Sequence, residues 1–280
     1  MWEARGRPRA YQSAREVREP RLGGRNGDEF RYGVQSVFSC TRLPTLDSRG
    51  ERHDRYAQEA SVRLLLTSGG VTNPSIHEAL VDLLGKPIAD CTALCIPTAQ
   101  WGHPMCGPAS VRGFVSGEPP WLMSSLGWKS VGVLELTALP SIGEQRWVPW
   151  VREADVLLVD GGDATYLCHW LRQSGLADLL PSLPETVWVG VSAGSMVMTP
   201  RIGADFVEWP SAPDDRTLGV VDFSIFPHLD VFPQNTMADA ERWATDIGGP
   251  AYALDDQTAI VVTDDTVKVV SEGQWKLFGS

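Results

Sequence analysis

The sequence predicts an α/β protein with a doubly wound, mostly parallel sheet and antiparallel strands at its C-terminal edge. Short apolar runs alternate with amphipathic stretches from about residue 62, and glycine-rich turns follow several of these runs. Closely spaced β-branched runs replace this alternation near the C-terminus. Such alternation is typical of βαβ units, whose sheet is covered by helices on both faces.

The expected parallel strands are short runs rich in Val, Leu and Ile, at residues 62–67, 93–98, 131–136, 154–159 and 187–191. Helices are expected between them at 75–84, within 108–126 and at 164–173, where apolar residues recur at helical spacing. After residue 192 we expect a strand at 223–226 and a helix at 236–247. The runs at 252–254, 259–263, 267–270 and 275–278 follow, and the last of them are expected to be antiparallel strands at a sheet edge.

Composition limits the class of protein. Of 280 residues, 43% are hydrophobic, which is enough for a substantial core. No apolar run approaches a membrane span and the N-terminus has no apolar signal region, so we expect a cytoplasmic protein. Reduced thiols are a better interpretation than a zinc site, because the cysteines are scattered and odd in number: Cys40, Cys91, Cys95, Cys106 and Cys168.

Charge divides the chain into two parts. Residues 1–60 carry a net charge of +3 and residues 61–280 a net charge of −14, within a total of −11. An acidic body would be repelled by nucleic acid and by anionic membranes, so neither is an expected partner. We expect residues 1–60 to form a disordered, Arg-rich extension and residues 61–280 to form a single domain, since no repeat or linker follows residue 60.

A serine between glycines stands where the fifth expected strand ends. The segment Gly190-Val191-Ser192-Ala193-Gly194 lies between an apolar run and a stretch that could start a helix. A sharp strand-to-helix turn exposes the serine side chain and brings the glycines too close to their neighbours for a Cβ. The N–H groups of such a turn, that of Ala193 first, can hold an oxyanion. We interpret Ser192 as a nucleophile; the alternative is a tight turn in which Ser192 only caps a helix.

A serine nucleophile needs a base, and two histidines would emerge near strand ends. His228 follows the apolar run at 221–226, and His103 lies in a loop after the second strand. We choose His228, the only histidine after Ser192; the alternative is a loop histidine that caps the backbone. A carboxylate would orient this histidine. The sequence alone does not select one of the candidates between Ser192 and His228, which are Asp205, Glu208, Asp214, Asp215 and Asp222.

The chain resembles the peptidase E and cyanophycinase family of serine peptidases over roughly residues 62–278. The resemblance is carried by the strand and Gly-x-Ser-Ala-Gly turn, by Pro200, by the Pro227-His228 pair, and by the Gly-Gly-Asp turn at 161–163. It implies a class I glutamine-amidotransferase-like fold and amide hydrolysis by a serine, with no metal or organic cofactor.

The resemblance also assigns catalytic roles. Ser192 matches the family nucleophile and His228 the family base. Glu208, two residues before Pro210, matches the acid, and Asp205 is the second choice.

Binding roles follow in the same way. Gly162 would supply an oxyanion N–H beside that of Ala193. Arg242, downstream of the histidine, matches an arginine that holds a substrate carboxylate, and Asp163 is grouped with it among the substrate-binding residues. The alternative for Arg242 is a surface arginine paired with a nearby acidic residue.

We therefore expect a serine peptidase that hydrolyses short peptides, dipeptidase E-like with Asp-X or related substrates. A homodimer is one possible assembly, and the sequence leaves the assembly open. One alternative is a cyanophycinase-like β-aspartyl peptidase. Its relatives cleave a β-aspartyl-arginine unit, and an acidic protein would attract such a cationic substrate modestly. Another is an α/β-hydrolase-type esterase, although the segment between Ser192 and His228 leaves little room for its strands and helices. The third is a catalytically silent binding protein, whose surface could use some of the eleven Trp residues.

Overall fold

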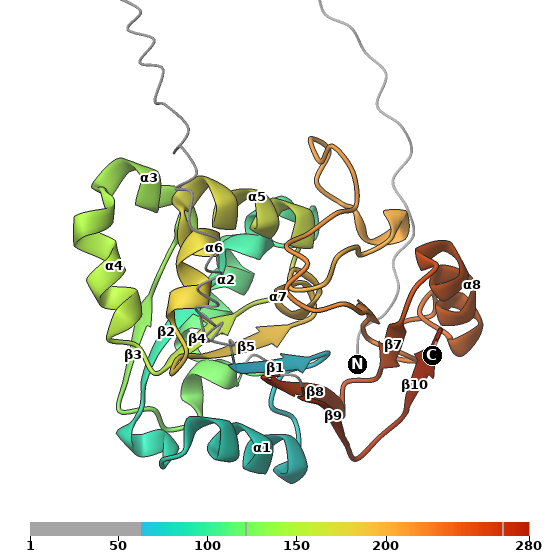
Figure 1. Ribbon diagram of the computed structural model, residues 1–280, viewed down its shortest axis with the longest axis horizontal. Helices are drawn as coiled ribbons and strands as arrows, with labels where there is room; N and C mark the ends of the chain where they lie inside the picture. Colours follow the sequence, from blue (N-terminus) through green and yellow to red (C-terminus); the bar gives the residue numbers. More distant parts are fainter. Residues whose placement is uncertain (1–62, 121, 265, 280) are drawn as a thin grey trace, which may run out of the picture. The chain divides into compact units, whose positions relative to one another are not determined.

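A seven-stranded sheet forms the centre of the computed structural model, which describes residues 63–120, 122–264 and 266–279 (Figure 1). The strand order is β3-β2-β4-β5-β1-β8-β9; the first five strands are parallel, and β8 and β9 are antiparallel. The strands are β1 (Arg63–Thr67), β2 (Thr92–Ile96), β3 (Ser130–Val133), β4 (Val156–Val159), β5 (Val187–Val191), β8 (Thr258–Thr263) and β9 (Thr266–Ser271). The predicted mostly parallel sheet with an antiparallel C-terminal edge is confirmed.

Helices cover both faces of this sheet, because successive strand residues point in opposite directions. Leu64 and Leu66 of β1 pack with the helices α4 and α5, whereas Leu65 packs with α1 and α2. Figure 1 shows α1 below the sheet and α3, α4 and α5 above it. The helices are α1 (Pro74–Leu84), α2 (Pro108–Ser116), α3 (Leu139–Ile142), α4 (Glu144–Arg152), α5 (Ala164–Ser174), α6 (Leu176–Leu179), α7 (Ala193–Met196) and α8 (Met237–Ile247).

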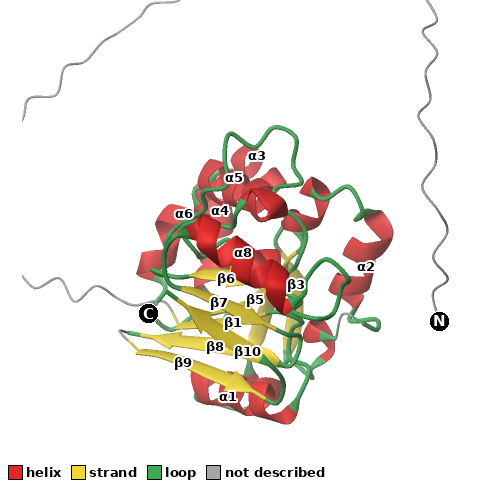
Figure 2. Cartoon of the chain, turned by 90° about the vertical axis from the view of Figure 1, so that its right-hand side faces the viewer, coloured by secondary structure: helices red, strands yellow, loops and turns green. Residues whose placement is uncertain are grey.

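A second, three-stranded sheet corrects one detail of the prediction. The run at 275–278 does form an antiparallel strand, β10 (Trp275–Phe278), but it pairs with β7 (Ala251–Leu254) instead of extending the large sheet. β7 also pairs in parallel with β6 (Ser224–Phe226). Helix α8 packs on this small sheet through a buried cluster that includes Phe226 and Trp243 (Figure 2). The apolar face of α8 therefore covers the small sheet.

The predicted helices agree with the structure, and the helix expected within residues 108–126 is α2. There α2 ends at Ser116, because Gly117 adopts a left-handed conformation with φ of 65°. The sequence analysis did not predict α3, α4 or α6. The described residues all fall within the unit Arg55–Ser280, and the prediction for residues 1–60 lies outside the described residues. Within the described residues, no helix has the length and apolar character needed to cross a bilayer.

Candidate active site

Ser192 occupies a strained turn between β5 and α7. Its φ of 48° and ψ of −109° are unfavourable for a residue with a side chain, and such strain is typical of exposed nucleophiles at strand-to-helix turns. The flanking glycines are required sterically. A Cβ on Gly190 would lie 2.3 Å from the carbonyl oxygen of Gly194, and one on Gly194 would lie 2.3 Å from that of Val159. The local reasoning from the sequence thus agrees with the backbone geometry.

The Gly161-Gly162 turn after β4 lies beside this serine. A Cβ on Gly161 would be in ordinary contact with Ser192 Cβ, at 3.5 Å. Gly162 has φ of +133°, and a Cβ there would lie 2.3 Å from the carbonyl oxygen of Ala99. Among the hydrogen bonds between described residues, none uses the N–H of Gly162 or of Ala193. The role of both N–H groups as oxyanion donors stays a prediction.

His228 follows β6 and has an unusual backbone conformation, with φ of 57°. Its N–H donates to Ser68 Oγ at 2.7 Å, and its ring nitrogen Nδ1 lies 2.7 Å from Asp256 Oδ1. When neutral histidine donates from Nδ1, Nε2 is left to accept a proton from a hydroxyl. The ring also contacts Phe232, with the ring centres 5.4 Å apart.

Strand pairing brings Ser192 beside Ser68, which in turn contacts His228. Thr67 of β1 pairs with Val191 of β5, so Ser68 and Ser192 leave neighbouring parallel strands at the same end. Ser192 N–H donates to the carbonyl oxygen of Thr67 at 3.1 Å, and Ser68 holds the backbone of His228. None of the hydrogen bonds between described residues joins Ser192 Oγ to His228 directly. Such bonds often tighten only when substrate binds.

The carboxylate beside His228 is Asp256, which the sequence analysis missed. Asp256 follows β7 and also accepts a hydrogen bond from Ser68 Oγ at 2.9 Å. Burial alone would raise the pKa of Asp256, but the hydrogen bond and charge of His228, together with the bond from Ser68, lower it below its ordinary value. An ionised Asp256 can orient the imidazole and stabilise its cation.

Glu208 and Asp205, the predicted acids, do not meet the histidine. Both residues are exposed, and no described hydrogen bond or ion pair joins either side chain to His228. The structure therefore gives Glu208 no contact through which it could orient the imidazole, whereas Asp256 lies beside the ring. One signal for Asp256 was available in the sequence, namely a carboxylate directly after an apolar strand beyond the histidine.

Asp163 has a structural role instead of the predicted role in substrate binding. It is fully buried at the N-terminus of α5, where Oδ1 accepts from Thr165 Oγ1 at 2.6 Å and from Tyr166 N–H at 2.7 Å. Its other oxygen, Oδ2, accepts from the N–H groups of Glu208 and Trp209 at 2.7 and 2.8 Å. With four donors, this carboxylate has no capacity left for a substrate, and it ties the 208–209 segment to α5.

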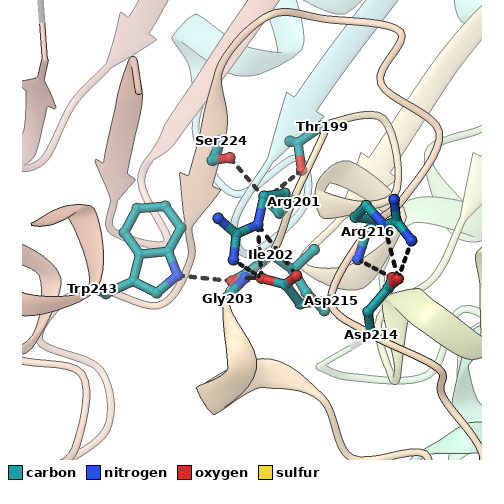
Figure 3. A network of polar contacts seen from close by, with 9 residues as sticks. All are labelled: Thr199, Arg201, Ile202, Gly203, Asp214, Asp215, Arg216, Ser224 and Trp243. Carbon is teal, nitrogen blue, oxygen red and sulfur yellow. Dashed lines mark hydrogen bonds and ion pairs between the residues drawn. The ribbon is translucent and has the colours of Figure 1, made fainter. Parts of the chain in front are cut away.

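A polar network holds the base of the loop that carries residues 208 and 209 (Figure 3). Arg201 forms a two-pronged ion pair with Asp215, and Arg216 pairs with Asp214. Trp243 Nε1 of α8 donates to the carbonyl oxygen of Ile202 at 2.7 Å. The network fixes both ends of the loop, so the carboxylates at 214 and 215 are structural partners of arginines.

Arg242 and His103 lie apart from this group of contacts. Arg242 is on α8 with its side chain 70% exposed, and it pairs with Asp239 one turn earlier. No described contact joins Arg242 to Ser192, so its binding role stays a prediction. His103 Nδ1 accepts from the N–H of Met105 at 3.1 Å, which agrees with a loop histidine that caps the backbone.

The site combines a serine in a strained turn with a histidine–carboxylate pair and two N–H groups that form no hydrogen bond among the described residues. This combination is typical of serine hydrolases. The profile of Peptidase family S51 matches residues 64–270. The chain therefore belongs to peptidase family S51, the peptidase E family of serine-type peptidases, which confirms the resemblance seen in the sequence.

Individual proteins agree with this family. An uncharacterized peptidase of Pasteurella multocida (strain Pm70) is 28% identical over 123 residues, which are 40% of this chain and 58% of that protein. The chain thus aligns with little more than half of that relative's length.

Solved structures show the same fold. A structure described as a peptidase E from Listeria monocytogenes EGD-e has a TM-score of 0.58 at 18% identity, covering 76% of this chain and 99% of its own. A peptidase from an acI-B1 actinobacterium has a TM-score of 0.57 at 19% identity, covering 79% and 95%. These similarities confirm the class I glutamine-amidotransferase-like fold.

Proposed function

We propose that this protein is a peptidase E-like enzyme that hydrolyses short peptides through Ser192, His228 and Asp256. The observation that carries the proposal is the strained Ser192 at the strand end next to Ser68, which itself holds His228. Membership in family S51 supports the same reaction class.

The mechanism follows from the roles of these groups. His228 Nε2 takes the proton of Ser192 as Oγ attacks the scissile carbonyl carbon, and Asp256 stabilises the imidazolium that forms. The N–H groups of Gly162 and Ala193 donate to the negative oxygen of the tetrahedral intermediate. The intermediate then collapses, the imidazolium gives its proton to the leaving amine, and the acyl group stays on Ser192. Water, deprotonated by His228, releases the acyl group in a second, equivalent step.

The proposed substrates are dipeptides of the type Asp-X, with β-aspartyl dipeptides as the alternative. A substrate carboxylate needs a cation or several donors, and Arg242 remains the candidate for it. An Arg242→Ala variant should then raise KM for Asp-X about tenfold and leave kcat nearly unchanged, because a contact made equally in substrate and transition state affects binding only. An unchanged KM would remove Arg242 from the site.

The first experiment labels the nucleophile and measures turnover together. An organophosphonate probe, which needs an activated serine, should add to the peptide containing Ser192 in the wild-type protein and not in Ser192→Ala. Ser211→Ala is a matched control, because Ser211 is an exposed serine outside the site. Full hydrolysis of peptides by Ser192→Ala would overturn the proposal.

A substrate panel then decides between the specificities. Asp-Leu, β-Asp-Leu, Leu-Leu and a simple ester are offered to the wild-type enzyme, and we expect Asp-Leu to give the highest kcat/KM. Preference for β-Asp-Leu would favour the cyanophycinase-like alternative, turnover of esters alone would favour an esterase, and the absence of any labelling would favour a binding protein.

A further inference from the structure

A buried carboxyl group lies directly behind the oxyanion turn and has no role in the mechanism above. Asp160 directly follows β4 and precedes Gly161, and only 2% of it is exposed. Its Oδ1 accepts from Gly161 N–H at 2.8 Å, and its Oδ2 accepts from the side-chain amide nitrogen Nε2 of Gln100, which is also 2% exposed. The other amide atom, Gln100 Oε1, is buried and has no hydrogen-bond partner among the described residues.

The surroundings of Asp160 contain no cation among the described residues that could pair with a carboxylate. The neighbouring titratable groups are the thiols of Cys95 on β2 and Cys106, and the Asp163 carboxylate, which has its own four donors. Burial raises the pKa of Asp160 to about 8, and the hydrogen bond from Gly161 opposes this only in part. A buried charge without a partner costs far more than a neutral carboxyl group in the same place.

Gln100 offers the acceptor that a neutral carboxyl group needs. Amide oxygen and nitrogen have nearly the same shape, so rotating the amide by half a turn puts Oε1 opposite Asp160 Oδ2. The carboxyl O–H can then donate to Oε1 while Oδ1 keeps the N–H of Gly161. The amide nitrogen takes the unpartnered place of the oxygen, and the buried charge is removed.

We propose that Asp160 keeps its proton at neutral pH, donates it to Gln100 Oε1, and in this form positions the Gly161-Gly162 turn. The connection to the turn is short. Asp160 holds Gly161 N–H, and Gln100 belongs to the 3₁₀ helix η2 (Thr98–Gly102), whose residue Ala99 accepts from Asp163 N–H at 2.9 Å. Both ends of the turn are therefore fixed by this pair and the segment that carries it.

Ionisation of Asp160 would weaken hydrolysis. A negative charge behind the turn opposes the developing oxyanion, and a carboxylate repels Gln100 Oε1, so the amide must turn back. Asp160 is thus a positioning residue that makes activity fall as the pH rises through its titration. This inference rests on the proposed function, because it uses Gly162 N–H as an oxyanion donor.

The kinetic test compares pH profiles of kcat for Asp-Leu hydrolysis. In the wild-type enzyme, kcat should fall about tenfold between pH 7 and pH 9. The reason is that only about a tenth of the Asp160 side chains stay protonated at one pH unit above a pKa of about 8. Asp160→Asn imitates the neutral form, because its amide can donate to Gln100 and accept from Gly161. It should keep most of the activity at pH 7 and lose less than twofold by pH 9. Asp178→Asn, at an exposed position on α6, should keep the wild-type profile.

Infrared difference spectra between the wild type and Asp160→Asn provide a test that needs no activity. A C=O stretching band of a buried protonated carboxyl should be present at pH 6, absent from the variant, and lost from the wild type by pH 10. Absence of this band at pH 6 overturns the proposal. If the band is present but kcat of Asp160→Asn falls between pH 7 and pH 9 as much as that of the wild type, the positioning role is overturned. Failure of the proposed function would show instead as missing organophosphonate labelling of Ser192, with the infrared result unaffected.

Discussion

Replacing Asp256 with Asn tests the catalytic group where structure and sequence disagree most. Asp256 Oδ1 receives both the His228 ring nitrogen and the Ser68 hydroxyl, at 2.7 and 2.9 Å. Asn keeps the shape but loses the negative charge, and its amide nitrogen can face the imidazole and favour the wrong tautomer. The loss of an orienting acid in a serine triad lowers kcat by about 10⁴.

That factor corresponds to about 5.5 kcal/mol of transition-state stabilisation, at about 1.4 kcal/mol per tenfold change in rate. The residual activity should come from the N–H groups of Gly162 and Ala193, which the substitution leaves in place. KM should change little, because Asp256 acts through His228 and touches no substrate. The assay is steady-state hydrolysis of Asp-Leu at pH 7.5, with circular dichroism to show that the variant is folded.

The matched control is Glu208→Gln, the acid that the sequence favoured. Its side chain is exposed and has no described partner, so kcat should stay within about twofold of the wild type. If kcat falls about 10³-fold or more in Glu208→Gln while Asp256→Asn retains more than a tenth of the wild-type kcat, the assignment of Asp256 as the orienting acid is refuted. Ser68→Ala should lower kcat by an intermediate factor of about tenfold, since it removes one hydrogen bond to the ionised Asp256 and the acceptor of the His228 backbone N–H.

Three further predictions concern the turn after β4. Gly162→Ala should lower kcat about 100-fold, because a Cβ 2.3 Å from the carbonyl oxygen of Ala99 displaces one oxyanion donor, whereas Gly161→Ala, with no contact below 3.5 Å, should lose less than tenfold. Asp163→Asn should lower the free energy of unfolding by about 3 kcal/mol in urea, because an amide nitrogen must face backbone N–H groups; a loss below 0.5 kcal/mol would contradict its structural role. Folding raises the pKa of Asp160 from 3.8 to about 8, so the stability that this group contributes is complete below about pH 4 and is lost as the pH rises to 8. Between pH 5 and pH 8 the free energy of unfolding of the wild type should therefore fall by about 4 kcal/mol relative to that of Asp160→Asn. The same pH dependence of this free energy in both proteins would exclude the raised pKa.

Local features were predictable because each depends on a few adjacent residues. The steric need for Gly190 and Gly194 follows from the turn itself, and the structure shows the close carbonyl contacts that exclude a Cβ. Ser192 and His228 could be chosen because each directly follows an apolar strand. For Ser192 the strand order was not needed, since the carboxyl ends of the parallel strands meet at the same end of the sheet in any such order.

The division of C-terminal strands between two sheets was not predictable in this way. The sequences of β8 and β10 both read as short strands, and nothing in either one specifies its partner. In the small sheet, Trp243 of α8 packs with Phe226 of β6 in a buried cluster that also includes residues of β7. This packing joins residues far apart in the chain, which periodicity does not reveal.

The carboxylates show why the orienting acid could not be selected from sequence. Asp163 and Asp256 each follow a strand, and each could emerge at the active end of a sheet. What separates them is the set of donors they meet. Asp163 is saturated by four hydrogen bonds that hold a loop, whereas Asp256 meets the imidazole of His228 and the hydroxyl of Ser68. Those donors come from segments brought together by strand pairing between β1, β5 and β8 and by the small sheet that carries the histidine. A carboxylate therefore acquires its role from tertiary contacts, and the same residue type serves here for orientation, for loop anchoring and, at Asp160, for holding a proton behind the oxyanion turn.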